Sequence, residues 1–346
     1  MVKLRILFFR VLFKAVSWVL HLITAIRSMR IGGSDFSDIL IENLPIAKSG
    51  QVSPLKPLDR KNTILGIIIP FRDKWPLTEK CLQSVESQIV SGNVSIRIYL
   101  IDNGSVEKRT KDGCDAYQQN SKFEVAVIPD KNAFNFSAIN NKAAKIAQQD
   151  GCSHLLFLNN DIEIESHSSL NELIEAYFSI KNACLLGCTL QYPNKTVQHL
   201  FAAPGFKIVA AHPFKGMPLN LKSKWHQSPR QVPAITGAVM LTSVSNFFAV
   251  NGFDENLPTL GQDIDLCLSF QKKTFEIWVA TSVVFTHHEG LTRGDCFDRE
   301  QIHYIYNKWG EHLVSNPVFS TRISRWSETP VYSLGEPAFP WTLVIP

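Results

Sequence analysis

Residues 155–164 read Leu-Leu-Phe-Leu-Asn-Asn-Asp-Ile-Glu-Ile, and this stretch decides the fold. Its apolar first half is typical of a buried parallel strand, and the run stops abruptly at Asn159, Asn160 and Asp161. Open α/β sheets bind ligands at the carboxyl ends of such strands. A carboxylate beside two amides suits a divalent metal that carries a diphosphate, because hard cations prefer oxygen ligands. The stretch therefore predicts a ligand site at a sheet edge, with Asp161 as a metal ligand.

A second polar cluster follows about a hundred residues later, as Gln262-Asp263-Ile264-Asp265-Leu266, and His287 and His288 come after it. Asp263 and Asp265 begin a predicted helix, where acids interact favourably with the helix dipole even without a catalytic role. The two histidines follow a β-rich run and are adjacent, so they face opposite sides of an extended chain. One of them can reach the site, and the sequence leaves open which one binds metal. A carboxylate for metal, a carboxylate for proton transfer and a histidine indicate a metal-assisted transferase.

The rest of the chain alternates between predicted strands and helices, which favours a mostly parallel, Rossmann-like sheet flanked by helices. Strands are predicted at 64–70, 95–102, 123–128, 155–159 and 277–285, and helices at 78–87, 137–148, 170–180 and 263–273. Ser137 is the expected N-cap of the second helix. Residues 198–233 lose the pattern and are expected to form a loop on the acceptor side of the site.

The 346 residues suffice for one large α/β domain or two small ones. We expect a membrane-associating helix over 1–30, a linker over 31–61, the catalytic domain over 62–310 and an irregular tail over 311–346. The net charge of +4 is mild and gives no reason to expect nucleic-acid binding. Seven scattered cysteines without a CxxC pair indicate neither a disulfide framework nor a zinc site, and a reducing compartment is the simplest interpretation.

The N-terminal segment carries the excess positive charge, since no acid precedes Asp35. Polar residues recur at helical spacing along one stripe that includes Arg10, Lys14 and His21, and apolar residues with Trp18 cover the rest. This pattern favours an amphipathic helix in the membrane interface, with basic groups facing anionic headgroups. A spanning anchor, a signal peptide and a helix packed on the domain remain open alternatives.

An ordered set of motifs over roughly residues 62–310 resembles the family 2 glycosyltransferases, which are inverting enzymes with the GT-A fold. Each motif alone is weak, whereas the order and spacing of the set are specific. The matching segments are Ile67–Asp73, Leu100–Ser105, Asn135–Asn140, Asn159–Asp161 in place of the DxD motif, Thr236–Ala238, Gly261–Leu266 and His287–Gly294. The last segment is similar to a variant found in O-antigen and capsule glycosyltransferases, including suspected rhamnosyltransferases.

The resemblance implies a role for each matched residue. Asp263 would be the catalytic base, and Mg²⁺ or Mn²⁺ would be held by Asp161 with His287 or His288. Asp102 would meet the nucleobase of the donor, and Arg293 would hold the departing diphosphate. The other implied donor-site residues are Pro70, Arg72, Asp73, Asn135, Asn159 and Asn160, and the implied acceptor-side residues are Gly237, Ala238 and Asp265. His199 also matches a family position, but the match implies no role for it.

Two departures from the family pattern stand out, since Asn159 replaces the first acid of DxD and Gln262 replaces the usual Glu before the base. The first leaves the metal with one acidic ligand fewer. The expected function is transfer of a sugar from a UDP- or dTDP-linked donor to a lipid-linked or growing glycan. The expected location is the cytoplasmic face of a bacterial inner membrane, to which the protein binds peripherally.

The alternative is a non-catalytic member of a polysaccharide assembly complex that binds a nucleotide sugar or a glycan. The presence of Asp161, Asp263 and the histidines disfavours that alternative. A nucleotidyltransferase would need a basic Gly-rich loop after the first strand, and Pro70-Phe71-Arg72-Asp73 does not supply one. The donor sugar, the acceptor and the linkage are not fixed by the sequence.

Overall fold

The computed structural model describes residues 63–91, 93–206, 209–288 and 298–314, together with residues 11, 12, 14–16, 18–20, 22, 23, 324, 328 and 331. The predicted linker over 31–61 lies outside the described residues. So does most of the predicted tail over 311–346.

The N-terminal half of the main sheet is parallel, as the strand and helix alternation predicts. β1 (Thr63–Phe71) pairs with β2 (Val94–Asp102) and with β4 (His154–Leu158), and β2 pairs with β3 (Glu124–Pro129), all in parallel. The buried strand predicted before Asn159 is β4, whose residues 155–158 are buried. The carboxyl ends of β1, β2 and β4 therefore meet at one edge of the sheet.

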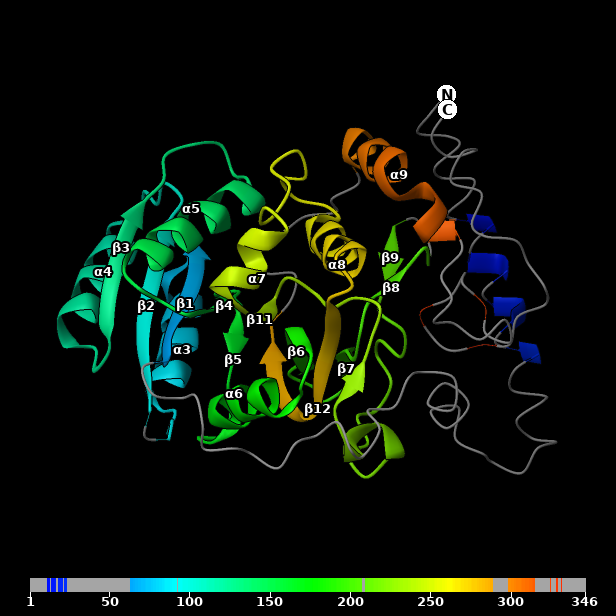
Figure 1. Cartoon of the computed structure of the whole chain (residues 1–346), viewed down its shortest axis with the longest axis horizontal. Helices are drawn as coiled ribbons and strands as arrows, with labels where there is room; N and C mark the ends of the chain where they lie inside the picture. Colours follow the sequence, from blue (N-terminus) through cyan, green and yellow to red (C-terminus); the bar gives the residue numbers. More distant parts are fainter. Residues whose placement is uncertain are drawn as a thin grey trace.

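Helices connect these parallel strands (Figure 1). They are α3 (Trp75–Glu86), α4 (Lys108–Asn120) and α5 (Phe136–Gln149). The sequence did not predict α4, because only Thr110 and Cys114 are buried in it and its apolar periodicity is weak. The predicted N-cap Ser137 is wrong, since Asn135 occupies that position and its side chain accepts a hydrogen bond from Ala138 N. Ser137 instead donates its hydroxyl to Leu257 O over 2.7 Å.

The C-terminal half of the sheet contains antiparallel pairs, but all of its long strands except one keep the direction of the first half, so the long strands of the sheet are mostly parallel, as predicted. β11 (Val239–Ser243) runs antiparallel between β4 and β6 (Ala183–Gln191), and β12 (Glu276–His287) runs parallel to β6. Short strands extend this half: β5 (Ile162–Glu163) and β10 (Arg230–Gln231) on β12, and β7 (Val197–His199) on β6. Within the predicted loop at 198–233, β8 (Ala203–Pro204) pairs with β9 (Ala210–Ala211) and a 3₁₀ turn, η1, spans Lys224–Gln227.

Helices cover both faces of the sheet, which confirms the α/β class (Figure 1). One core cluster contains residues of α5, α7 (Val244–Ala249), α8 (Gln262–Lys272) and α9 (Arg299–Val314). The other contains residues of α3 and α6 (Ser169–Ser179). Helix α9 continues to Val314, across the boundary predicted at residue 310.

His154, the first residue of β4, gives the fold a testable pH dependence. Its ring packs edge-on against Tyr177 and Phe178, with centroids 5.4 Å and 5.0 Å away. Burial lowers the pKa of His154 from 6.5 to about 4, so the unfolded chain binds more protons between these values. The free energy of unfolding should therefore fall on acidification from pH 6.5 to 4, by at most about 3 kcal/mol.

The His154→Phe variant should lack this contribution, because Phe has no proton to bind. Urea unfolding of both proteins across the window measures the difference in slope. Parallel pH dependences for the two proteins would contradict the assignment to His154.

The described residues between 11 and 23 are helical, in agreement with the predicted N-terminal helix. Val11, Trp18 and Leu22 are 61%, 69% and 48% exposed, whereas Leu20 is buried. Among the described residues, no helix is both long and apolar enough to cross a membrane.

Candidate functional site

The ends of β1 and β2 form the first part of the site. Phe71 pairs with Asp102 in the parallel register, so Arg72 and Asp73 emerge beside Asp102. Asp102 Oδ1 accepts a hydrogen bond from Ser105 N over 2.7 Å, which closes the turn Asp102-Asn103-Gly104-Ser105. Arg72 is exposed, and Pro70 and Asp102 are half-buried. The structure thus brings these predicted donor-site residues to one edge.

Asp73 supports this edge through its own contacts. Its backbone N–H donates to Ser105 Oγ over 2.8 Å, and its carboxylate accepts from Val106 N and Glu107 N over 2.8 and 2.9 Å. Asp73 and Lys74 both have positive φ, at 49° and 51°, so the chain turns sharply after β1. Asp73 therefore joins the β1 loop to the β2 loop and the start of α4. Sequence reasoning missed Ser105 in this role, and the turn sequence around it was the available signal.

The acidic stretch after β4 meets the histidines at the end of β12. β5 pairs antiparallel with β12, with Ile162 opposite His287. The Nε2–H of His287 donates to Asp161 Oδ1 over 3.1 Å, and His288 N donates to Asp161 O over 3.0 Å. Asp161 and His287 are 5% and 6% exposed, and His287 Nδ1 is buried without a hydrogen-bond partner. The pair predicted from distant parts of the chain is thus in direct contact.

The neighbouring acids have other partners. His288 lies 3.0 Å from Glu163, between Nε2 and Oε2, and Glu165 accepts from Lys195 Nζ and Thr286 Oγ1 over 2.6 Å each. These contacts separate the histidines that the sequence could not tell apart. His287 contacts Asp161, whereas His288 contacts Glu163 at a more exposed position.

Helix α3 lies beside the turn that carries Asp161. Asn160 Nδ2 donates to Thr78 Oγ1 over 2.9 Å, and Cys81 Sγ donates to Asn159 O over 3.6 Å. Burial raises the pKa of the Cys81 thiol and the charge of Asp161 raises it further, so Cys81 is a neutral donor here. Sequence reasoning missed Thr78, since its partner lies in a distant segment.

Hydrogen bonds link the turn that carries Asp161 to the second acidic cluster. Asn159 N donates to Ala238 O over 3.0 Å, and Gly237 N donates to Asp263 Oδ2 over 3.1 Å. Ala238 is buried, whereas Asp263 is half-buried at the first turn of α8. A Cβ on Gly237 would lie 3.3 Å from Phe136 Cζ, so the backbone passes closely between α5 and α8. The residues of three predicted motifs therefore meet beside Asp263.

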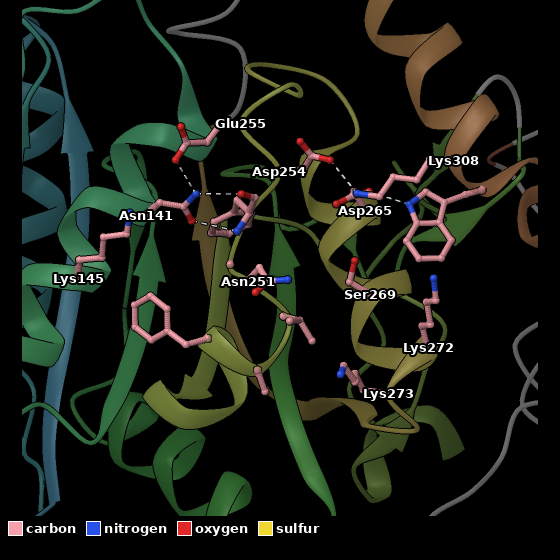
Figure 2. A pocket seen from close by; sticks show the side chains of 16 residues that line it. Asn141, Lys145, Asn251, Asp254, Glu255, Asp265, Ser269, Lys272, Lys273 and Lys308 are labelled. Carbon is pink, nitrogen blue, oxygen red and sulfur yellow. Dashed lines mark hydrogen bonds and ion pairs between the residues drawn. The ribbon is translucent and has the colours of Figure 1, made fainter.

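The sequence led us to expect Asp265 on the acceptor side of the site, but the structure does not place it there. Successive residues of a helix are about 100° apart, so Asp263 and Asp265 point to opposite sides of α8. Asp265 is 2% exposed, and its Oδ1 accepts from Lys308 Nζ and from Trp309 Nε1, each over 2.7 Å. Figure 2 shows this carboxylate between α8 and α9. Asp265 holds α9 against α8.

Asn135, His199 and Arg293 are the other positions that match the family's motifs. Asn135 caps α5 and donates its Nδ2 to Glu255 O over 2.9 Å, so its side chain organises the site edge. The Nδ1 atoms of His199 and His212 are 2.7 Å apart, which means that one ring donates to the other. Arg293 lies outside the described residues, and its predicted contact with diphosphate stays a prediction.

Comparison with known proteins agrees with this geometry. Residues 66–223, which include most of β1, all of β2 and β4, and Asp161, match the model described as "Glycosyl transferase family 2". Over these residues the chain is similar to that family. The matched range ends before Asp263 and His287, so their placement rests on the structure.

Curated relatives point the same way. The chain is 27% identical over 277 residues to "Uncharacterized protein y4gI" of Sinorhizobium fredii, an alignment that covers 75% of this chain and 29% of the relative. It is 28% identical over 232 residues to "O-antigen biosynthesis protein RfbC" of Myxococcus xanthus, covering 66% of this chain and 18% of that protein. The chain thus spans less than a third of the length of either relative.

Solved structures confirm the GT-A fold. The structure of GalNAc-T7 with UDP, GalNAc and Mn²⁺ matches with a TM-score of 0.58 and 14% identity, covering 72% of this chain and 49% of that one. The mannosyltransferase PcManGT of Pyrobaculum calidifontis, in complex with GDP-Man and Mn²⁺, matches with a TM-score of 0.52 and 11% identity. That alignment covers 88% of this chain and 75% of PcManGT.

Proposed function

We propose that this protein transfers a sugar from a nucleotide diphosphate donor, UDP- or dTDP-linked, to a hydroxyl of a lipid-linked or growing cell-surface glycan. The observation that carries the proposal is the contact between Asp161 and His287, linked through Asn159, Ala238 and Gly237 to Asp263. A donor site and a proton acceptor are thereby held on one sheet edge. The O-antigen name of one relative supports the choice of acceptor class.

The donor would lie over the carboxyl ends of β1, β2 and β4. Asp102 and Arg72 stand at the ends of paired strands, in the position from which the nucleoside can be bound. Asn159 and Asn160 follow β4 and would lie near the diphosphate. The two solved structures contain UDP and GDP-Man, which supports a nucleotide-linked donor for this fold.

The residues at the strand end fit a divalent metal, Mg²⁺ or Mn²⁺. Asp161 provides carboxylate oxygen and His287 provides imidazole nitrogen, and the two buried side chains are in direct contact. These are ligand types that Mn²⁺ accepts, and Mn²⁺ is present in both solved structures. No group of three or more His, Cys, Asp or Glu side chains arranged for a metal occurs within the described ranges, so donor oxygens would complete the coordination. When bound, the metal would neutralise charge on the departing diphosphate.

Asp263 would act as the general base. Its carboxylate is half-buried and oriented by Gly237 N and by its own helix, where Ile264 N donates to Oδ1 over 2.9 Å. It would accept the proton of the acceptor hydroxyl as that oxygen attacks the anomeric carbon. A single displacement of this kind inverts the configuration at that carbon. Arg293 would hold the diphosphate as it departs, since guanidinium bonds phosphate oxygens in pairs.

Nucleotide binding tests the donor proposal directly. UDP or dTDP together with Mn²⁺ should raise the melting temperature, because a ligand at a hundredfold excess over its Kd stabilises the native state by about 2.7 kcal/mol. Adenosine diphosphate with Mn²⁺ serves as the control for metal chelation. No stabilisation by any pyrimidine nucleoside diphosphate would contradict the proposed donor class.

We also propose that the protein acts at the cytoplasmic face of a bacterial inner membrane and binds that membrane peripherally through its N-terminal helix. Basic residues precede and follow the described turns of this helix, and apolar side chains such as Val11 and Trp18 are exposed on it. An exposed apolar face with basic neighbours suits an interface of anionic lipid.

Replacing exposed apolar residues of this helix should weaken membrane binding. We expect the Val11→Asp, Trp18→Asp double variant, and the chain lacking residues 1–30, to remain in the supernatant when wild-type protein sediments with anionic vesicles. The double variant keeps the buried Leu20, so it controls for the loss of helix packing in the chain that lacks residues 1–30. Vesicles of zwitterionic lipid separate the electrostatic contribution. Equal sedimentation of wild type and both altered proteins would show that the helix is not the anchor.

A further inference from the structure

Helix α9 packs over the segment that leads to Asp263. Gln301 Oε1 accepts from Thr259 N and Leu260 N over 2.9 Å each. At Gly261 the φ angle is +75°, and an added Cβ would lie 2.7 Å from Ile305 Cδ1, so the chain needs glycine here. The backbone before α8 is thus held by α9 at successive residues.

Lys308 extends this contact to the first turn of α8. Its Nζ lies 2.7 Å from Asp254 Oδ2 and 2.7 Å from Asp265 Oδ1, and Trp309 Nε1 donates to the same Asp265 oxygen. Figure 2 shows Lys308 reaching from α9 towards both carboxylates at the rim of a groove. Asp265 is 2% exposed, so water is a poor substitute for these donors.

The electrostatics of this cluster are consistent with a bound ammonium. Burial acts to lower the pKa of Lys308, but hydrogen bonds to Asp254 and Asp265 outweigh it, and the pKa is raised. Burial acts to raise the pKa of Asp254, but hydrogen bonds from Lys308 and Tyr304 outweigh it, and the pKa is lowered. Lys308 is therefore charged, and it bridges carboxylates from different segments.

We propose that Lys308 and Trp309 are positioning residues for the base Asp263, a role that rests on the proposed glycosyl transfer. They fix the first turn of α8 through Asp265. That turn also carries Asp263, whose carboxylate must stay against Gly237 N to face the acceptor. Without Lys308, the only side-chain hydrogen bond described for Asp265 is the one from Trp309. A buried carboxylate without its cation is unfavourable, so the first turn of α8 should shift towards solvent.

The test compares Lys308→Met with Lys308→Arg and with Lys273→Met. Lys273 is exposed on the α8 side of the same groove and has no carboxylate partner among the described residues, so it is the matched control. Lys308→Met should lower kcat of transfer by about 10- to 100-fold, because small displacements of a reacting group can cost that much. The Kd for nucleoside diphosphate and the acceptor KM should stay at the wild-type values. Lys308→Arg should restore most of kcat, since guanidinium can bond both carboxylates.

Replacing both Asp265 and Lys308 tests whether the loss of kcat in Lys308→Met comes from the carboxylate that is left without its ammonium partner. The Asp265→Asn, Lys308→Met double variant has no uncompensated carboxylate at residue 265, so its kcat should exceed that of Lys308→Met. If Lys308→Met does not fold, Trp309→Phe replaces it, since it keeps a ring and removes only the donor to Asp265. A kcat equal to that of wild type in a folded Lys308→Met or Trp309→Phe protein would overturn the proposal.

Hydrogen exchange provides a readout without activity. Amides of residues 259–266 should exchange faster in Lys308→Met than in wild type and Lys273→Met, whereas amides of β1 and β2 should not change. Unchanged exchange over 259–266 overturns the positioning role even if no acceptor is found. If wild type itself neither binds nucleotide nor transfers sugar, the proposed function fails, and the exchange result still decides whether α9 orders this segment.

Discussion

Asp263→Asn should reduce the rate of glycosyl transfer by about 10²- to 10⁴-fold, the usual range for removal of a general base. The amide keeps the shape of the carboxylate, and its oxygen can still accept from Gly237 N, as Asp263 Oδ2 does over 3.1 Å. It cannot take the proton of the acceptor hydroxyl. Transfer rates of wild type and variant, measured under saturating donor, provide the comparison.

Two controls accompany this prediction. The Kd for nucleoside diphosphate should not change in Asp263→Asn, because the proposed base would face the acceptor and not the nucleotide. Asp265→Asn should cost less turnover, or lose it through a lower melting temperature, since Asp265 is bonded to Lys308 and Trp309. A folded Asp263→Asn protein with transfer near the wild-type rate would remove the assignment of the base.

Asp161→Ala should lower metal-dependent binding of nucleoside diphosphate by more than about 100-fold. Even residues outside a metal's own ligand set typically change its affinity by 10- to 100-fold, and Asp161 would be a direct ligand. Its partner His287 would keep an imidazole but lose the 3.1 Å contact with carboxylate. Calorimetry with UDP or dTDP, with and without Mn²⁺, measures the effect.

Glu165→Ala is the matched acid-to-alanine control. Glu165 follows β5 and belongs to the same acidic stretch as Asp161. Its carboxylate accepts hydrogen bonds from Lys195 and Thr286. Asp161→Asn adds a variant that keeps a hydrogen-bond acceptor for His287 and removes the charge. Metal-dependent binding equal to wild type in both Asp161 variants would show that Asp161 is not a ligand.

The sequence was sufficient for the parallel half of the sheet because its strands are continuous apolar runs that end in polar residues. The run Leu155–Leu158 is buried throughout, and the turn after it brings Asp161 to the edge. Helix α4 and strands β6 and β11 were not predicted. The composition of α4 is mostly polar. The position of β11 in the sheet depends on its pairing with both β4 and β6.

The site could be predicted to the level of segments but not of contacts. Alternation showed that only one of His287 and His288 could reach the site, and the pairing of β5 with β12 then places His287 beside Asp161. For Asp265 the prediction from the sequence was wrong. Its neighbours in sequence suggested an acceptor-side role, whereas its partners Lys308 and Trp309 lie on a helix that only the tertiary structure brings close.

Turnover of nucleotide sugars by the purified protein tests the central claim most directly. Wild type, Asp161→Ala and Glu165→Ala would be incubated with a panel of UDP- and dTDP-linked sugars, with Mn²⁺ or with a chelator, and released nucleoside diphosphate would be measured. The account predicts that wild type and Glu165→Ala consume at least one donor only when metal is present, and that Asp161→Ala does not. Consumption of no donor by wild type, or equal consumption by Asp161→Ala, would contradict it.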